Sequence, residues 1–430
     1  MEEVPDVRKT WVPQAIPFMY PGLSHVGGFL WERYGGVHMI YLDNAATTRM
    51  APEVLEAMLP YFTQQYGNPS SIHAGGSAGK KAVSQARRTI AQAIGARQEE
   101  IYFTSGGSEA DNWAIKAVAE SYGHKGKHII TAKIEHHAVL HTCMELEKKG
   151  FQVTYLDVDG EGKISLEELV AAIRPDTILV SIMCANNEVG TIEPVAQIGA
   201  ITRQRGILFH TDAVQALGQI PVHVEEMCVD LLSASAHKLN GPKGVGMLYI
   251  REGVEIGAML YGGTQERKRR AGTENVPGIV GFGAAVERAV GRMEEKAAAV
   301  RHLRDYLIRR IEEEIPYCRL NGHDRDRLPG NVNFTFRFVR GESLVILLDM
   351  KGICASSGSA CTSGAVEASH VLLAMGLAEE DAHGSLRMTL SEENTVEELD
   401  YVVEQLVQIL EKLRGMSSSY EAFLAGKGEA

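Results

Sequence analysis

Apolar and polar positions alternate in a regular way through the first two thirds of the chain. Apolar runs of four to seven residues are separated by longer stretches whose apolar residues recur at helical spacing. The runs lie at 101–104, 127–132, 177–183, 207–210, 231–234 and 246–250, and the helical stretches at 52–66, 79–94, 108–121 and 137–149. Short apolar runs between helices are typical of buried parallel strands joined by crossover helices. The pattern therefore predicts an α/β fold, with a large domain built on a doubly wound, mostly parallel sheet.

The last third of the chain follows a different pattern. A long helical stretch covers 278–314, and residues 331–338 then alternate between apolar and polar, which predicts a half-exposed antiparallel strand. A second strand at 385–390 and an amphipathic helix at 396–413 complete a smaller α+β domain. We expect an N-terminal extension of unknown role at 1–38, the large domain at 39–275, the small domain at 276–415 and a frayed tail at 416–430.

Composition and charge exclude several classes of protein. The chain has 430 residues and a formal net charge of −12, which argues against nucleic-acid or anionic-membrane partners, although 266–270 is a local basic run. No apolar stretch approaches the roughly 20 residues that a membrane span needs. The six cysteines form no C-x-x-C pair, so neither a metal site nor a thioredoxin-type motif is predicted. With no secretory signal, free thiols indicate a cytoplasmic protein.

Lys238 is the residue whose position is most informative. It follows the apolar run 231–234 and precedes a Gly-Pro turn at Gly241, within the segment Ser-Ala-Ser-Ala-His-Lys. Desolvation at such a place lowers the pKa of an amine and frees it for Schiff-base chemistry. The alternative is an ordinary lysine at the start of a loop that reaches solvent or pairs with a carboxylate.

Polar residues also follow other predicted strands. Asp212, after the run 207–210, is placed to hold the protonated pyridine nitrogen of pyridoxal phosphate, with Gln215 in reach of the ring oxygen; a helix cap is the alternative. Gly107 and Ser108 begin a helix, where backbone amides and a hydroxyl suit a phosphate. That segment lacks the lysine of an ATP-binding loop, and an ordinary capped helix start would look similar.

Three further residues carry candidate chemistry. His136 follows the run 127–132 and could stack on a planar cofactor or relay protons, or could be an ordinary loop residue. Asn187 ends the next strand and offers an amide to a ring hydroxyl or a carboxylate. Cys361 lies in a run of small residues, 356–364, which favours an accessible and reactive thiol over a structural one; a small filler residue is the alternative.

Taken in order and spacing, these segments resemble the cysteine desulfurases of the NifS/IscS type, which are fold-type-I pyridoxal-phosphate enzymes of the class-V aminotransferase superfamily. The resemblance covers about 40–410 and begins with 41–48 and 67–73. Its specific motifs are Ser-Ala-His-Lys at 235–238 and Ser-Ser-Gly-Ser-Ala-Cys-Thr-Ser at 356–363. One departure is Ser108, where the family usually has threonine, and this change keeps the hydroxyl.

The resemblance implies a role for each site residue. Lys238 would form the Schiff base with the cofactor, and Cys361 would be the nucleophile that accepts sulfur. The other implied cofactor contacts are Asp212 at the ring nitrogen, Gln215 and Asn187 near the ring oxygen, His136 stacked on the ring, Gly107, Ser108, Ser235 and His237 at the phosphate, and Thr273 supplied by a neighbouring subunit. The implied substrate contacts are Arg387 as a clamp for the carboxylate, Asn187 and Asn68.

The implied activity is removal of sulfur from L-cysteine, which leaves L-alanine and a persulfide on Cys361. Expected partners are a second copy of the chain and sulfur acceptors such as an iron–sulfur scaffold or a tRNA-thiolating protein. The alternatives are a selenocysteine lyase, another class-V transaminase, or a catalytically silent scaffold. The silent scaffold is disfavoured because the chain has all five residues of the implied chemistry: Lys238, Asp212, His136, Cys361 and Arg387. Because a thiol of ordinary pKa near 8.5 is mostly protonated at pH 7, either the site activates Cys361 or His136 takes its proton.

Overall fold

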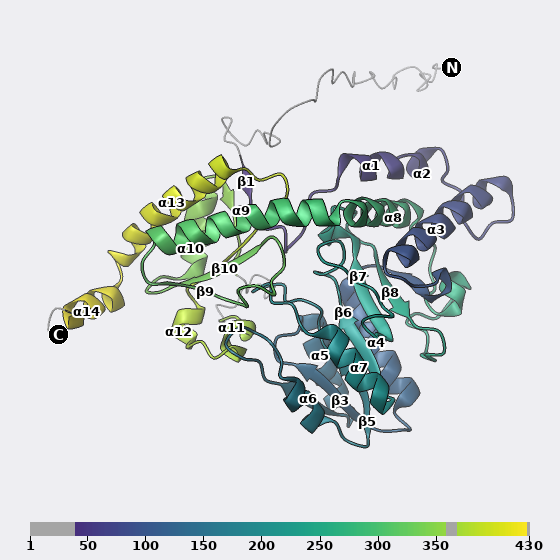
Figure 1. Cartoon of the computed structure of the whole chain (residues 1–430). Helices are drawn as coiled ribbons and strands as arrows, with labels where there is room; N and C mark the ends of the chain where they lie inside the picture. Colours follow the sequence, from purple (N-terminus) through teal and green to yellow (C-terminus); the bar gives the residue numbers. More distant parts are fainter. Residues whose placement is uncertain (1–38, 358–367, 428–430) are drawn as a thin grey trace, which may run out of the picture.

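The computed structural model describes residues 39–357 and 368–427 (Figure 1). The predicted N-terminal extension 1–38, the segment 358–367 that contains Cys361, and residues 428–430 lie outside the described residues. The domain boundaries and the role of the extension stay predictions.

A seven-stranded sheet forms the larger layer, with strand order β2-β8-β7-β6-β5-β3-β4. Its strands are β2 (Ile101–Thr104), β3 (His128–Ala132), β4 (Gln152–Leu156), β5 (Thr177–Ser181), β6 (Leu208–Asp212), β7 (Leu231–Ser235) and β8 (Gly246–Ile250). Only β8 runs antiparallel to its neighbours, so the predicted mostly parallel sheet is confirmed.

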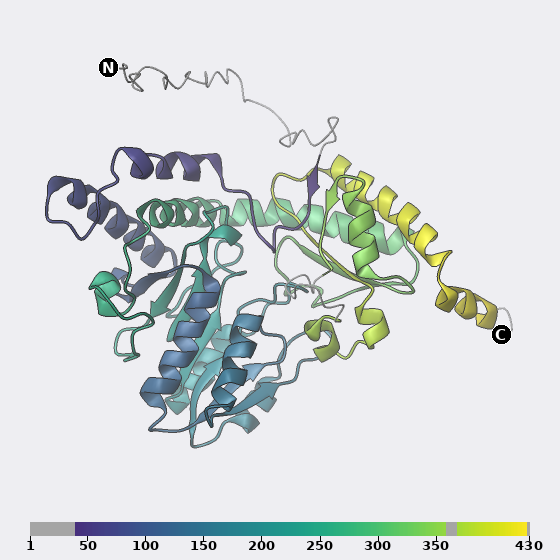
Figure 2. The same cartoon turned by 180° about the vertical axis from the view of Figure 1, so that it is seen from behind.

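Helices cover both faces of this sheet (Figures 1 and 2). They are α1 (Pro52–Met58), α2 (Pro60–Thr63), α3 (Ala74–Ala93), α4 (Gly107–Tyr122), α5 (His137–Glu147), α6 (Leu166–Ala172), α7 (Val195–Arg205) and α8 (Val276–Gly291). One apolar core joins one face of the sheet to α3, α7 and α8, and another joins the opposite face to α4 and α5. Because both faces are covered, most of these strands are buried along their whole length, which explains their continuous apolar runs.

A three-stranded antiparallel sheet forms a second layer, with order β12-β10-β9. Its strands are β9 (Cys318–Leu320), β10 (Asn331–Phe336) and β12 (Ser385–Thr389), and it packs with α9 (Met293–Glu314), α10 (Gly341–Asp349) and α13 (Val396–Arg414) around a separate core. The predicted half-exposed strand at 331–338 is wrong, because β10 is buried on both faces. Its apolar side chains enter this core, whereas Asn331 and Asn333 face the loop that follows β5.

Two other expectations are corrected. The helix predicted over 278–314 is broken at Arg292 into α8 and α9, which belong to different cores. The predicted frayed tail instead forms α14 (Ser418–Lys427), whose Tyr420 and Phe423 rings lie 6.0 and 5.4 Å from the Tyr317 ring. The remaining elements are α11 (His370–Ala374), α12 (Glu379–Ala382), and β1 (Ile40–Tyr41) paired in parallel with β11 (Ile353–Cys354).

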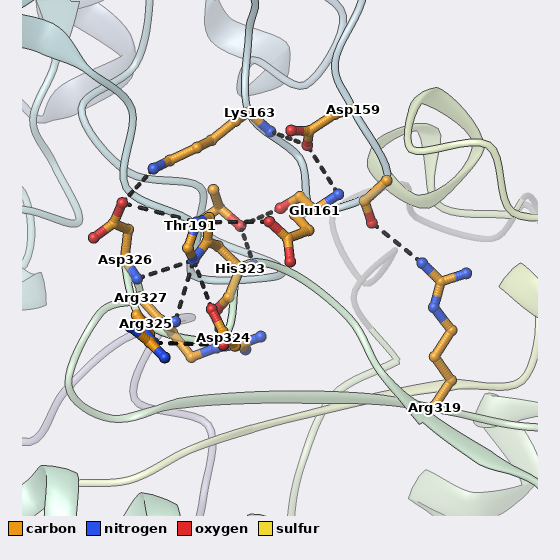
Figure 3. A network of polar contacts seen from close by, with 11 residues as sticks. Asp159, Glu161, Lys163, Thr191, Arg319, His323, Asp324, Arg325, Asp326 and Arg327 are labelled. Atoms are coloured by element: carbon orange, nitrogen blue, oxygen red, sulfur yellow. Dashed lines mark hydrogen bonds and ion pairs between the residues drawn. The ribbon is translucent and has the colours of Figure 1, made fainter.

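A polar network joins the two sheet layers (Figure 3). The loop after β4 contacts both β9 and the loop between β9 and β10: Arg319 Nη2 of β9 donates to the Gly160 carbonyl at 3.2 Å, and Lys163 pairs with Asp326 of the loop. Arg327 is buried behind them and donates to the His323 and Val189 carbonyls, both at 2.9 Å. These contacts fix the segment after β5 relative to the small sheet.

Candidate active site

A cavity of about 290 Å³ opens at the carboxyl ends of the parallel strands, where α/β sheets bind ligands. It collects most of the predicted site residues from separate elements: Gly107, Ser108, His136, Asn187, Asp212, Gln215, Ser235, His237, Lys238 and Arg387. Asn68 and Thr273 do not line this cavity and are exposed. Cys361 lies outside the described residues.

Lys238 enters the cavity from a short 3-10 turn (Ala236–Lys238) directly after β7. Its ammonium donates to the carbonyl oxygens of Ala45 and Ala46, the latter at 2.8 Å. The turn is closed by the Leu239 and Gly241 amides, which both donate to the Ala236 carbonyl. The buried strand and the turn therefore direct this amine toward the segment after β1.

Asp212 is the last residue of β6 and is buried beneath the cavity. One carboxyl oxygen accepts the Val214 amide at 2.8 Å, which closes a turn; no helix follows β6 directly, so the alternative of a helix cap is not borne out. Burial raises the pKa of Asp212 to about 6, although the Val214 hydrogen bond and the Lys238 charge oppose this rise. A cation bound in the cavity would favour the ionised carboxylate.

The start of α4 lines the cavity with Gly107 and Ser108. A Cβ atom at Gly107 would lie 2.6 Å from Val214 Cγ2, so only glycine lets the helix start approach the end of β6 this closely. The amides of this first helical turn, together with Ser235 and His237, suit a phosphate. His237 Nδ1 lies 3.1 Å from Thr47 Oγ1, and burial and Lys238 lower its pKa to about 4.

His136 caps α5 and is neutral at physiological pH. Its Nδ1 accepts the Ala138 amide at 3.1 Å, and burial, followed by the Lys238 charge, lowers its pKa to about 4. With Nδ1 accepting, the neutral ring carries its hydrogen on Nε2. A second proton on Nδ1 would break the cap. The geometry therefore favours a stacking or donating role over the alternative in which His136 takes the proton of Cys361.

Arg387 projects from β12 and is buried. Its Nη2 donates to Asp43 Oδ1 at 2.9 Å and its Nη1 to the Asn187 carbonyl at 3.1 Å, while Nε has no hydrogen-bond partner among the described residues. A desolvated guanidinium with an unused donor is suited to a carboxylate ligand. The pairing with Asp43 was not expected from the sequence, since it joins residues 344 positions apart.

Two buried carboxyl groups close to the site were also missed. Asp111 lines the cavity, and its Oδ1 atom lies 3.6 Å from His210 Nε2. This oxygen atom has no hydrogen-bond partner among the described residues. Glu135 accepts the Met183 amide at 2.7 Å. Burial, and then the neighbouring Asp212, raises the pKa of both. The sequence held a signal for Asp111, because it shares a helix face with the apolar residues 114, 115 and 118.

Comparison with known proteins agrees with this geometry. The model of the aminotransferase class-V family matches residues 40–402. Cysteine desulfurase IscS of Methanosarcina thermophila is 57% identical over 378 residues, covering 88% of this chain and 93% of its own length. The IscS of Clostridium botulinum strain Hall is 54% identical over 393 residues, covering 91% of this chain and 99% of its own length.

Solved structures give the same result. A NifS-like protein superposes with a TM-score of 0.82 at 42% identity, covering 87% of this chain and 99% of its own. The NifS-like protein of Rickettsia africae superposes with a TM-score of 0.79 at 32% sequence identity, covering 87% of this chain and 100% of its own.

Fold and cavity define an enzyme of the aminotransferase class-V type. An amine, a carboxylate, an anion-binding helix start and an imidazole surround one space, and this set fits pyridoxal phosphate, the cofactor of such enzymes. The chain belongs, within this class, to the cysteine desulfurase family.

Asp111→Asn should stabilise the cofactor-free protein increasingly as pH rises. Because the folded-state pKa of Asp111 is raised, its stabilising contribution is complete below the unfolded-state pKa near 3.9 and is lost as pH rises toward the folded-state value. Asparagine cannot ionise and so avoids this loss. Between the two pKa values, the free energy of unfolding of the variant should rise relative to wild type by up to about 1.4 kcal/mol per pH unit. Urea unfolding between pH 4 and 8 measures the difference.

The exposed Glu255→Gln variant is the control and should show no pH-dependent difference from wild type. A constant difference between Asp111→Asn and wild type from pH 4 to 8 would mean that Asp111 is already ionised in the folded protein.

Proposed function

We propose that the protein removes sulfur from L-cysteine in the cavity around Lys238 and carries it as a persulfide on Cys361. The supporting observation is that one cavity brings together Lys238, Asp212 and Arg387, which come from the turn after β7, from β6 and from β12. These three groups suit a reaction of an amino acid on the cofactor. The Lys238 amine can exchange with the substrate amine, the Asp212 carboxylate can balance the charge of the cofactor ring, and the Arg387 guanidinium can bind the substrate carboxylate.

Bound pyridoxal phosphate supplies an electron sink for the bonds at Cα of the amino acid. Asp212 would keep the ring nitrogen protonated by its charge, while the α4 start, Ser235 and His237 would hold the phosphate. Arg387 orients the substrate carboxylate. Lys238 would hold the cofactor through its amine and, once free, would take up the Cα proton.

Cys361 is proposed as the sulfur acceptor. Its thiolate attacks the substrate sulfur, so that the new S–S bond forms as the C–S bond breaks and the carbon fragment leaves as L-alanine. Support comes from the two described flanks of its segment. Ser356 and Arg387 exchange backbone hydrogen bonds of 3.0 and 2.6 Å, and Ser369 Oγ donates to Glu188 Oε2 at 2.5 Å, next to Asn187. Both flanks thus adjoin residues of the cavity.

The proposal is tested by product analysis. Purified enzyme given L-cysteine without a thiol acceptor should release one L-alanine per persulfide formed, and the persulfide should map to Cys361. Formation of a keto acid with loss of the amino group would indicate a transaminase instead. A strong preference for selenocysteine with little persulfide would indicate a selenocysteine lyase.

A homodimer with shared cavities is also proposed. Thr273 and Asn68 do not line the cavity of their own chain, and α1, α2 and the following loop expose large apolar side chains: Leu59, Phe62, Tyr66 and Ile72. An exposed apolar patch of this kind is typical of an association surface. Thr273 would then reach the phosphate of the second copy.

Mixed dimers test this sharing. Thr273→Ala should weaken cofactor binding about tenfold, since it removes one hydrogen bond to a charged group. A dimer of one Lys238→Ala chain and one Thr273→Ala chain should regain about half of the wild-type activity, because the Lys238→Ala chain supplies Thr273 to the intact cavity. Activity no higher than that of the Thr273→Ala homodimer would place Thr273 in its own cavity.

Sulfur acceptors follow from the enzyme class, whereas an iron–sulfur scaffold or a tRNA-thiolating partner stays a proposal. Across residues 39–357 and 368–427, none of the helices has the length and apolarity to cross a membrane. The cytoplasmic compartment, expected from the cysteine pattern, stays a prediction.

A further inference from the structure

The segment 186–190, here termed the Asn187 corner, follows β5 after four intervening residues and contributes Asn187 to the lining of the cavity. Within it, Asn186 Oδ1 accepts the amides of Glu188 and Val189 at 2.8 and 3.0 Å, and Gly190 turns the chain at φ +80°. The Asn187 carbonyl accepts from Arg387 Nη1 at 3.1 Å. The position of this corner therefore determines where one side of the Arg387 guanidinium is held.

Side chains of the small-sheet layer donate hydrogen bonds to the next two carbonyls of the corner, those of Glu188 and Val189. Asn333 Nδ2 and Asn331 Nδ2 both donate to the Glu188 carbonyl, at 3.0 and 3.1 Å, and Arg327 Nη1 donates to the Val189 carbonyl at 2.9 Å. These three side chains are 0%, 3% and 2% exposed. In such a dry interface each donor would be costly to leave unpaired, so the contacts are firmly held.

Strand register places Asn333 beside Arg387. The two residues are direct partners in the antiparallel ladder of β10 and β12, and cross-strand partners point to the same face of a sheet. Their side chains reach consecutive carbonyls of the corner, Glu188 and Asn187. The Asn333 amide is itself oriented, because Asn321 Nδ2 donates to its Oδ1 at 2.9 Å.

We propose that Asn333 is a positioning residue for the substrate carboxylate, acting through Arg387. By fixing the Glu188 carbonyl, Asn333 fixes the Asn187 carbonyl, which holds Arg387 Nη1 in the orientation that presents the guanidinium to the cavity. The inference rests on the proposed function of Arg387 as the carboxylate clamp. It assigns to the small sheet a role in substrate affinity through a residue that does not line the cavity.

Asn333→Ala in the holoenzyme should raise the KM for L-cysteine about tenfold and change kcat less than about threefold, because binding rather than chemistry is affected. The affinity for L-alanine, which carries the same carboxylate and needs no turnover, should fall by the same factor in a cofactor-absorbance titration. The matched control is Thr335→Val. Thr335 is the next residue on the same face of β10 and accepts from Asn321 at 2.9 Å, but the Asn187 corner is held by other side chains. It should leave KM unchanged.

A double-mutant cycle separates positioning from general stabilisation. If Asn333 acts through Arg387, adding Asn333→Ala to Arg387→Lys should raise KM by less than about twofold beyond the Arg387→Lys value. Additive effects would overturn the inference while leaving the role of Arg387 intact. An Arg387→Lys enzyme with unchanged KM would instead refute the proposed carboxylate clamp, and the inference with it.

If Asn333→Ala does not fold, Asn331→Ala provides a second test of the proposal. It removes the second donor to the Glu188 carbonyl and should shift KM in the same direction by a smaller factor. An unchanged KM in every folded variant of these two asparagines would overturn the proposal.

Discussion

Lys238→Ala should lower turnover of L-cysteine by at least about 10²-fold, because the same amine attaches the cofactor and moves the Cα proton. The cofactor should still bind without a covalent link, since the residues proposed to hold its phosphate, the α4 start, Ser235 and His237, are unchanged. The variant should therefore bind pyridoxal phosphate with altered absorbance and release almost no alanine. Absorbance spectra and an alanine assay measure the two effects separately.

Lys243→Ala provides the matched control, because Lys243 lies five residues further on, is exposed and lines a different cavity. It should retain both absorbance and turnover. Borohydride reduction followed by peptide mapping should place the cofactor on Lys238. Recovery of the cofactor on another lysine would contradict the assignment.

The positions of Lys238 and Asp212 could be predicted because each follows a buried strand. In a parallel sheet the carboxyl ends of all strands meet at one edge, so sequence position after a strand is enough to place a residue near the site. Asp43 and Asp111 could not be placed in this way. Asp43 reaches the site only through pairing with Arg387, and Asp111 through the packing of α4 against β6 and β7.

Two errors in the fold prediction arise from the position of a strand in the tertiary structure. Alternating polarity in β10 suggested a solvent-facing side, but Asn331 and Asn333 donate to the Asn187 corner and Thr335 accepts from Asn321, so none of them faces water. The strand β4 was missed because, at the sheet edge, it is only partly buried and carries no continuous apolar run. The polarity of β10 therefore reflects tertiary neighbours and that of β4 reflects its place at the sheet edge, and local periodicity reveals neither.

The described cysteines narrow the choice of nucleophile. Cys184, which lies near the Asn187 corner, is fully buried, and burial followed by the Asp212 charge raises its pKa to about 12. Cys143 is also buried, and its pKa is raised to about 12 by burial and by Glu135. Thiols held so far from ionisation are poor nucleophiles at neutral pH. Cys354, which lies in β11 seven residues before Cys361, remains the alternative to test.

Cys361→Ser should lower alanine production from L-cysteine by about two orders of magnitude or more, while the fold and the absorbance of bound cofactor stay near wild type. Cys361 is not among the residues proposed to hold the cofactor, so binding of cofactor and substrate should persist. The lost step is sulfur transfer, because a serine hydroxyl attacks divalent sulfur poorly and cannot store a persulfide. Parallel Cys354→Ser and Cys184→Ser variants should keep their turnover. Normal turnover by Cys361→Ser, with the persulfide mapped by mass spectrometry to Cys354 or another cysteine, would show that the mechanism proposed for this chain is wrong.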